Sequence, residues 1–198
     1  MSDPVCDVCQ RAMPAHEEGV HLGSQSSGPY YSCITCFNKE VAEGAGIPFE
    51  TPTFSPVTLT DGQGNPHVFH FLTRLCPAGV LIEAYEVIGG LRAGYEFRYL
   101  CENPLVESLH LLQTVLDRAN RMLAQKHVDQ TARGARLTES KSLKGRIICD
   151  PSDANPEGMP AFVIDGVRYS WSEVGKLLLG QDGFQFKLEI KDPVDDIS

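Results

Sequence analysis

Two Cys-x-x-Cys pairs near the N-terminus constrain this chain more than any other feature. The first pair is Cys6 and Cys9, and the second is Cys33 and Cys36, with 23 residues between the pairs. Two residues between cysteines allow a tight turn to bring both sulfurs onto one edge of a tetrahedron, and a second such pair completes four-coordinate zinc. The sequence therefore predicts one structural Zn²⁺ held by these four thiolates.

Three other uses of paired cysteines compete with a zinc site: a redox Cys-x-x-Cys motif, a disulfide and an iron–sulfur cluster. A redox motif normally occurs once, within a βαβ unit, and the first fifty residues are too few to form one. The chain has seven cysteines, which is an odd number for a disulfide framework. We therefore favour zinc, or another divalent ion at the same position, over a site in which His16 or His21 replaces a cysteine.

The segments around the cysteines predict a small module over residues 1–50. The first pair lies in a turn, a Gly/Ser-rich turn at 23–28 separates two short apolar runs, and the second pair opens an amphipathic stretch. This order of elements is a cysteine-bearing turn (a zinc knuckle), a hairpin, and a helix that carries the last ligands in its first turn. It resembles the treble-clef group of zinc fingers, with a plain zinc ribbon as the alternative. This resemblance covers residues 4–46. It implies a fold for the module and no activity, because functionally unrelated proteins share the motif.

A shell of four sulfurs limits what the metal can do. It leaves no open coordination position, so the ion should not activate water. Four thiolates around one divalent ion also add a formal charge of about −2 to a module that already has two basic and seven acidic side chains. Binding of nucleic acid through this module is therefore disfavoured, because the module would repel phosphates.

Residues 51–128 predict an antiparallel β-meander covered by one long helix. Strands are expected at 57–60, 67–75, 80–88 and 95–101, where turn-forming sequences separate β-branched and aromatic runs. A helix is expected from Pro104 to His127, with one apolar stripe formed by Leu105, Leu109, Leu112, Leu116, Ala119 and Leu123. We expect this stripe to cover the sheet; a homodimer through the 104–127 helix is the alternative.

The last third predicts a basic linker and a C-terminal ββαβ segment over residues 147–198. Residues 129–146 contain five basic side chains and no periodicity, which is typical of a linker or mobile loop. A hairpin is expected over 161–170, and Ser170 and Glu173 have the form of a capping box that starts a short helix. Residues 184–191 alternate between apolar and polar side chains, which predicts a half-buried strand before an acidic tail.

Charge and hydropathy bound the environment of the protein. The net charge is −9 and only one short stretch is basic, so nucleic-acid binding is disfavoured for the whole chain. No stretch has the roughly 18 to 20 consecutive apolar residues of a membrane helix, and the first residues do not form a signal-peptide pattern. We expect a soluble, cytoplasmic α+β protein that makes no contact with a membrane. Beyond the zinc module, it loosely resembles uncharacterised prokaryotic zinc-finger proteins, which imply no activity.

The leading functional hypothesis is a non-enzymatic interaction or adaptor protein, because the metal shell is closed and no catalytic constellation is visible. The first alternative is an enzyme, or an enzyme subunit, with a Cys/His site between the central sheet and the C-terminal segment. Its thiol would be Cys101 or Cys149, and Cys76 is the third cysteine outside the pairs, although buried structural thiols are commoner. The third hypothesis is nucleic-acid binding through the basic linker.

Two further pairs of candidates are weak. His67 and His70 are three residues apart on a predicted strand, and so are Glu83 and Glu86. This spacing sends the two members of each pair to opposite faces of a sheet. We therefore expect neither a histidine ligand pair nor a pair of catalytic carboxylates.

Overall fold

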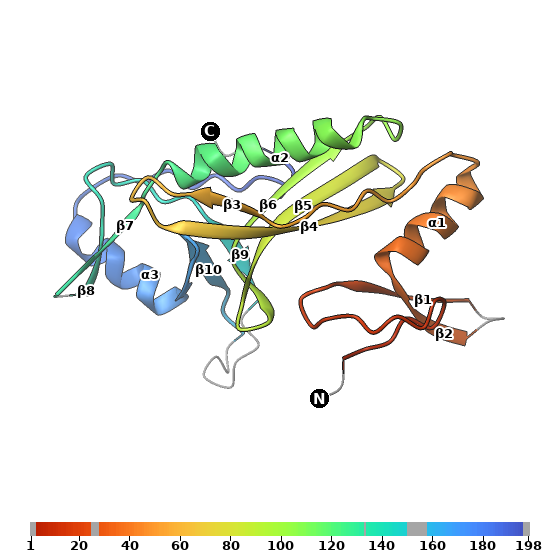
Figure 1. Ribbon diagram of the computed structural model, residues 1–198. Helices are drawn as coiled ribbons and strands as arrows, with labels where there is room; N and C mark the ends of the chain where they lie inside the picture. The colour runs from red at the N-terminus through yellow and green to blue at the C-terminus, as the bar shows by residue number, and fades with distance from the viewer. Residues whose placement is uncertain (1–2, 25–27, 133, 150–157, 196–198) are drawn as a thin grey trace.

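A four-stranded antiparallel sheet forms the centre of the computed structural model, which describes residues 3–24, 28–132, 134–149 and 158–195 (Figure 1). In spatial order its strands are β3 (Val57–Thr60), β4 (Pro66–Cys76), β5 (Gly79–Ile88) and β6 (Leu91–Cys101). Each strand pairs with the next one along the chain, so the predicted meander is confirmed. The tight connection between β4 and β5 depends on Gly79, whose φ is +128° and whose Cβ would collide with the carbonyl oxygen of Cys101.

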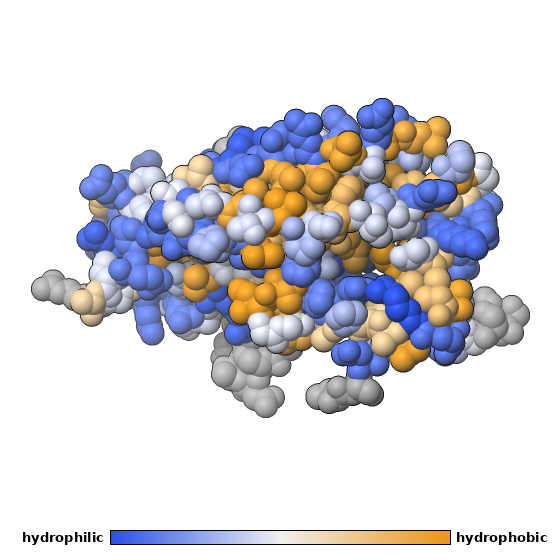
Figure 2. All heavy atoms as spheres, viewed as in Figure 1, coloured by the Kyte–Doolittle hydropathy of each residue, from blue (hydrophilic) through white to orange (hydrophobic). Residues whose placement is uncertain are grey.

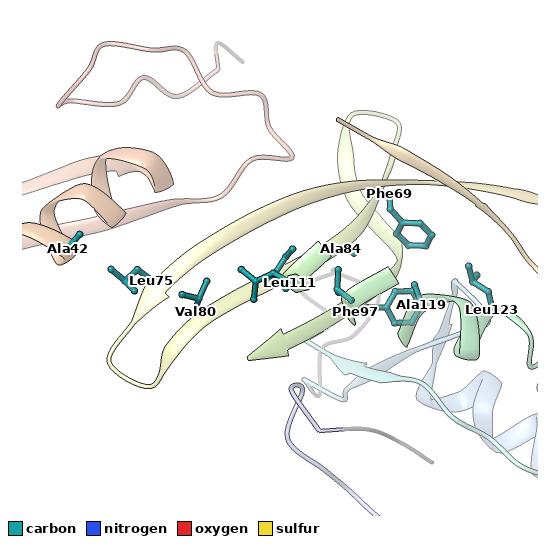
Figure 3. Close-up of a cluster of buried hydrophobic side chains, with 11 residues drawn as sticks. Ala42, Phe69, Leu75, Val80, Ala84, Phe97, Leu111, Ala119 and Leu123 are labelled. Carbon is teal, nitrogen blue, oxygen red and sulfur yellow. The ribbon is translucent and has the colours of Figure 1, made fainter. Parts of the chain in front are cut away.

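The helix α2 (Ser108–Leu123) covers one face of this sheet. Figure 3 shows the buried side chains of this core, which lie in a row from Ala42 of α1 and Leu75 of β4 at one end to Leu123 of α2 at the other. Phe69 and Phe97 supply the largest of them, with ring centroids 5.7 Å apart. Each apolar side chain of this size contributes about 1.5–3 kcal/mol when it is fully buried, so this core is what holds helix and sheet together.

The helix α2 is shorter than predicted, and it presents a partly different face to the sheet. It begins at Ser108 rather than near Pro104, and Leu105 and Leu109 are 61% and 70% exposed. Its buried side chains recur at every fourth position and are Leu111, Val115, Ala119 and Leu123. A spacing of four follows one inclined ridge of the helix, and the direction in which the helix crosses the sheet selects that ridge. The sequence offers apolar residues on more than one ridge, so periodicity alone predicted only part of the buried face, with Ala119 and Leu123 correct.

A hairpin and a helix precede the central sheet. They are β1 (Gly19–Ser24), β2 (Gly28–Cys33) and α1 (Ile34–Ala45), which follows β2 directly. Gly46 ends the helix with φ +66°, and its N–H donates to the carbonyl oxygens of Ala42 and Glu43. Residues 25–27 of the predicted Gly/Ser-rich turn lie outside the described residues.

The C-terminal unit, residues 127–181, has its own sheet. It contains the strands β9 (Arg146–Ile148), β10 (Ala161–Ile164) and β11 (Val167–Ser170), the helix α3 (Trp171–Leu178) and a short 3₁₀ helix, Leu179–Gln181. The predicted hairpin is confirmed: Asp165 and Gly166 both have positive φ in its turn. The predicted capping box is confirmed as well, since Ser170 accepts from the Glu173 N–H and its own N–H donates to the Glu173 carboxylate at 2.7 Å.

The prediction that residues 129–146 form a linker was wrong. They include most of a second hairpin, formed by β7 (Val128–Thr131) and β8 (Gly134–Leu137), and the first residue of β9. Val128 is buried in a core with Ile164, Tyr169 and Leu177, and Leu137 packs against that core from the partner strand. Residues 130–132 and 134–136 are exposed and carry no large apolar side chain, so the alternation that indicates a strand is too weak to recognise.

The prediction of a half-buried strand at 184–191 was also wrong. These residues belong to no helix or strand, and no strand in the described part of the chain pairs with them. Alternation shows that a segment can be a strand with one apolar face, but a strand also needs a neighbouring edge to pair with. Of the acidic tail that follows, residues 196–198 lie outside the described part.

With these corrections, the α+β fold class is confirmed. Figure 2 shows hydrophilic residues along the edge formed by α2 and apolar residues below it, over the strands β3 and β4. Among the described helices, none is both apolar enough and long enough to cross a membrane.

Candidate metal centre

The four cysteines of the two pairs come together at one point of the N-terminal module, residues 3–46. One sulfur from each of Cys6, Cys9, Cys33 and Cys36 lies within 4.8 Å of all the others. The Sγ atoms of Cys9 and Cys33 are 3.8 Å apart. Four sulfurs bound tetrahedrally at the usual zinc–sulfur distance would lie about 3.8 Å from one another. The spacing of the sulfurs therefore fits a tetrahedral divalent ion.

Backbone hydrogen bonds shape the turn that carries the first pair. The N–H of Cys6 donates to the Arg11 carbonyl, and the N–H of Gln10 donates back to the Cys6 carbonyl, both in the range 2.8–2.9 Å. Asp7 then ties the turn to β2, because its N–H donates to the Tyr31 carbonyl and its carboxylate accepts from the Tyr31 N–H at 2.6 Å. These contacts hold the first pair beside Cys33.

The second pair lies at the junction of β2 and α1. Cys33 is the N-cap residue of α1 and Cys36 lies in its first turn, where no side chain caps the helix. The unpaired N–H groups of a helix N-terminus favour negative charge, so this position stabilises thiolates. The junction therefore supplies two ligands, and the N-terminus of α1 gives both a favourable electrostatic environment.

The protonation of the cluster is uneven. Burial acts to raise the pKa of Cys6, but backbone N–H donors outweigh it and lower that pKa to about 6. The first of these donors is the N–H of Cys33, which is 3.2 Å from the Cys6 Sγ. Burial raises the pKa of Cys36, and hydrogen bonds that its own S–H donates to the neighbouring sulfurs raise it further. One sulfur is thus ready to ionise, and four thiolates at this spacing require a compensating cation.

Sulfur also makes up most of the core of the N-terminal module. The buried cluster consists of Cys6, Met13 and Cys33, with Tyr31 and Cys36 packed against it. A segment of this size cannot bury enough apolar surface to fold on its own. A metal bound by the four sulfurs would supply the cross-links that the core lacks.

A buried asparagine docks the N-terminal module onto the central sheet. Asn38 of α1 is fully buried; its Nδ2 donates to the Thr73 carbonyl at 2.8 Å and its Oδ1 accepts from the Leu75 N–H at 2.8 Å. Nδ2 also donates to the Thr51 hydroxyl. The sequence analysis missed Asn38, and no local signal marks it, because its partners are 13 to 37 residues away.

A chain of ion pairs crosses the face of the sheet opposite α2. It runs in order through Glu18, Arg92, Glu83, Arg98, Glu96 and Arg146, with distances of 2.8–3.1 Å. Its first member belongs to the N-terminal module and its last to the C-terminal unit. Glu83 and Glu96 are almost fully buried, so each of these charges depends on its arginine partners.

The structure places the candidate residues His67 and His70 on opposite faces of the sheet, as predicted for side chains three residues apart on a strand. His67 contacts Glu86, with 2.8 Å from Nδ1 to Oε1, and its ring meets Tyr95. His70 lies on the other face beside Tyr85 and His16. Burial lowers the pKa of His70, and the nearby His16 lowers it further. The two histidines therefore do not form a ligand pair.

The three remaining thiols have no histidine partner among the described residues. The thiol of Cys76 donates to the Gly79 carbonyl, Cys101 lies next to Tyr99, and Cys149 is exposed. A surface hollow of about 250 Å³ between the 48–52 segment and the start of α2 contains neither cysteine nor histidine among its lining residues. The described residues thus bring no nucleophile and base together at these positions.

Comparisons with known proteins match two parts of the chain. Residues 50–124 match the model of one Domain of unknown function (DUF7686), and residues 127–195 match that of another (DUF7713). The first match spans β3 to α2, and the second spans β7 to the end of the described chain. The four cysteines lie ahead of both matches. No curated protein and no solved structure matches this chain.

Proposed function

We propose that this chain is a zinc-binding interaction protein in which one Zn²⁺ has a structural role and no part in catalysis. The observation that supports the proposal is the convergence of four cysteine sulfurs within 4.8 Å of one another. All four potential ligands are sulfurs, which suits Zn²⁺ and leaves no coordination position for water. When bound, the ion would cross-link the first turn, the hairpin and α1.

The order of the elements supports a treble-clef topology for the N-terminal module. A turn that carries two cysteines precedes a hairpin, and a helix directly follows with the last cysteine in its first turn. A zinc ribbon would take its second pair of ligands from another hairpin, whereas here that pair lies at the start of a helix. Asn38 and the chain of ion pairs then fix the module against the rest of the protein.

Three features of the described residues support the proposed adaptor role. They provide a closed ligand set and exposed apolar side chains, and they bring no histidine to a thiol outside the cluster. The chain also has a net charge of −9, which favours protein partners over nucleic acid. We therefore propose that the surface of this protein carries its biological activity and that the metal only stabilises the fold.

The test is a metal analysis combined with substitution of one ligand. We expect about one zinc per chain in the purified protein, and loss of that zinc in Cys33→Ser. Removal of the ion should unfold the N-terminal module, seen as loss of dispersed NMR signals from residues 3–46, because apparent zinc-binding energies of about 10–16 kcal/mol drive the folding of such modules.

The matched control is Cys76→Ser, which removes a thiol outside the cluster and should keep both the zinc and the NMR signals. A Cys33→Ser protein that contains no metal and still has a folded N-terminal module would refute the structural role of zinc.

A further inference from the structure

The segment from residue 184 to residue 191 leaves an unusual amount of apolar surface exposed. Phe184, Phe186, Leu188 and Ile190 are between 62% and 91% exposed. They alternate with Gln185, Lys187, Glu189 and Lys191. In a strand, this alternation would place all four apolar side chains on one face and the polar ones on the other. The segment therefore has the pattern of an amphipathic strand and lacks a partner within the described chain.

Contacts with other parts of the chain lie near the two ends of the segment, and within it Glu189 pairs with Lys187 at 3.2 Å and with Lys191 at 3.8 Å. At one end the Lys141 ammonium lies 4.1 Å from the centre of the Phe184 ring, and at the other Arg118 of α2 donates to the Val194 carbonyl at 2.8 Å. Between them the chain joins none of the four sheets of the described structure. The middle of the segment is thus held at the surface, where another chain can reach it.

We propose that residues 185–191 pair with the same residues of a second copy of this chain, as two antiparallel strands with a two-fold axis at Leu188. In this register Phe186 lies opposite Ile190, and Leu188 lies opposite its own copy. Lys187 lies opposite Glu189 twice, once on each side of the axis. Opposite charges and large apolar side chains are the cross-strand pairs that stabilise a sheet, and a two-fold interface is self-complementary in this way.

Charge selects this arrangement over its neighbours. Moving the axis to Lys187 or Glu189 would place two like charges opposite each other, and a parallel pair in register would do so at every charged position. Moving the axis to Ile190 would set Leu188 opposite Asp192. The register centred on Leu188 is thus the one among these that satisfies both faces of the strand.

The exposed area is sufficient for a weak dimer. Four large apolar side chains with these exposures offer on the order of 500 Å² in each copy. Pairing buries only part of this area, because a two-stranded ribbon leaves its faces in solvent, and the main-chain hydrogen bonds of the new ladder add to the stability. We therefore expect a weak dimer with a dissociation constant on the order of 10 µM. This inference does not depend on the metal site.

Sedimentation velocity of the full-length, metal-loaded protein tests the proposal. We expect conversion from monomer to dimer between about 1 and 200 µM. Leu188→Asp should abolish the dimer up to the highest concentration, because two carboxylates would meet at the axis. The matched control is Leu109→Asp on α2, which changes an equally exposed leucine and should leave the dimer intact. A wild-type protein that stays monomeric, or a dimer lost in Leu109→Asp and kept in Leu188→Asp, would overturn the proposal.

A charge exchange tests the register itself. Lys187→Glu and Glu189→Lys should each weaken self-association about tenfold, because two attractive cross-strand pairs become repulsive. A mixture of these two variants should form a heterodimer of wild-type affinity, since each glutamate of one strand then faces a lysine of the other. Circular dichroism should be unchanged in both, because the two side chains are exposed. If the mixture associates no better than the separate variants, the proposed register is wrong.

Discussion

The N-terminal module and the C-terminal unit flank the same sheet, but they are stabilised by different means. The core of the N-terminal module is built from sulfur atoms, whereas Val128, Ile164, Tyr169 and Leu177 give the C-terminal unit an apolar core. The module docks through a buried amide, and the unit reaches the sheet through the Arg146–Glu96 ion pair, whose arginine is partly exposed. The N-terminal module, which has few apolar residues, therefore depends for its stability on a metal ion and on docking to the central sheet. The C-terminal unit can be stabilised by its own apolar core.

The largest loss of stability should come from removing the Asn38 amide that docks the N-terminal module. Asn38→Ala leaves the Thr73 carbonyl and the Leu75 N–H buried without a partner, which we expect to cost about 4 kcal/mol of unfolding free energy. Urea denaturation of the zinc-loaded protein measures this cost, and Lys39→Ala on the exposed side of α1 is the control. Equal stability of the two variants would show that the module does not depend on its docking contact.

A smaller effect is expected from a cavity in the C-terminal unit. Leu177→Ala removes a buried side chain from a core of few residues, and we expect a loss of about 2.5 kcal/mol. Leu178→Ala, one position along the same helix and half exposed, is the control. If the unit is stabilised by its own core, the loss should be the same with and without zinc. A loss that disappears when zinc is removed would mean that the unit depends on the module.

The smallest effect concerns the start of α3. Ser170→Ala removes the cap and should destabilise the C-terminal unit by about 1 kcal/mol. Hydrogen bonds from the Ser170 backbone and hydroxyl lower the pKa of Glu173 below its usual value of 4.5. The stabilisation from ionised Glu173 is therefore present above its ordinary pKa and is lost as the pH falls through the lowered value. In Ser170→Ala an NMR titration should show the pKa of Glu173 moving back towards 4.5, with Ser172→Ala as the control; an unmoved pKa would contradict the capping contact.

Features that depend on residues close together in the chain could be predicted from the sequence. The spacing within each cysteine pair is set locally, by a turn for Cys6 and Cys9 and by the start of α1 for Cys33 and Cys36, and the capping box needs only Ser170 and Glu173. The strands of the meander were predicted because each pairs with the next across a turn marked in the sequence. These features have local causes, so one sequence is enough to find them.

Features that depend on distant residues could not be predicted in the same way. The burial of Asn38 and the chain of ion pairs need partners from different elements, and nothing near either marks them in the sequence. The buried face of α2 was partly mistaken because the sheet selects one ridge of a helix that has apolar residues on several. The hairpin over 128–137 was missed because, among its described residues, Val128 and Leu137 are the ones whose side chains join the apolar core.

The sequence by itself determined the candidate metal ligands and the antiparallel meander, because turns and caps act over a few residues. Tertiary structure decided which side of α2 is buried, how the N-terminal module docks on Asn38, and that residues 184–191 find no strand beside them in the described chain. Alternation gives a strand its two faces, but hydrogen bonding to a neighbouring edge is a property of the assembled molecule. That edge is what a second copy of the chain would provide.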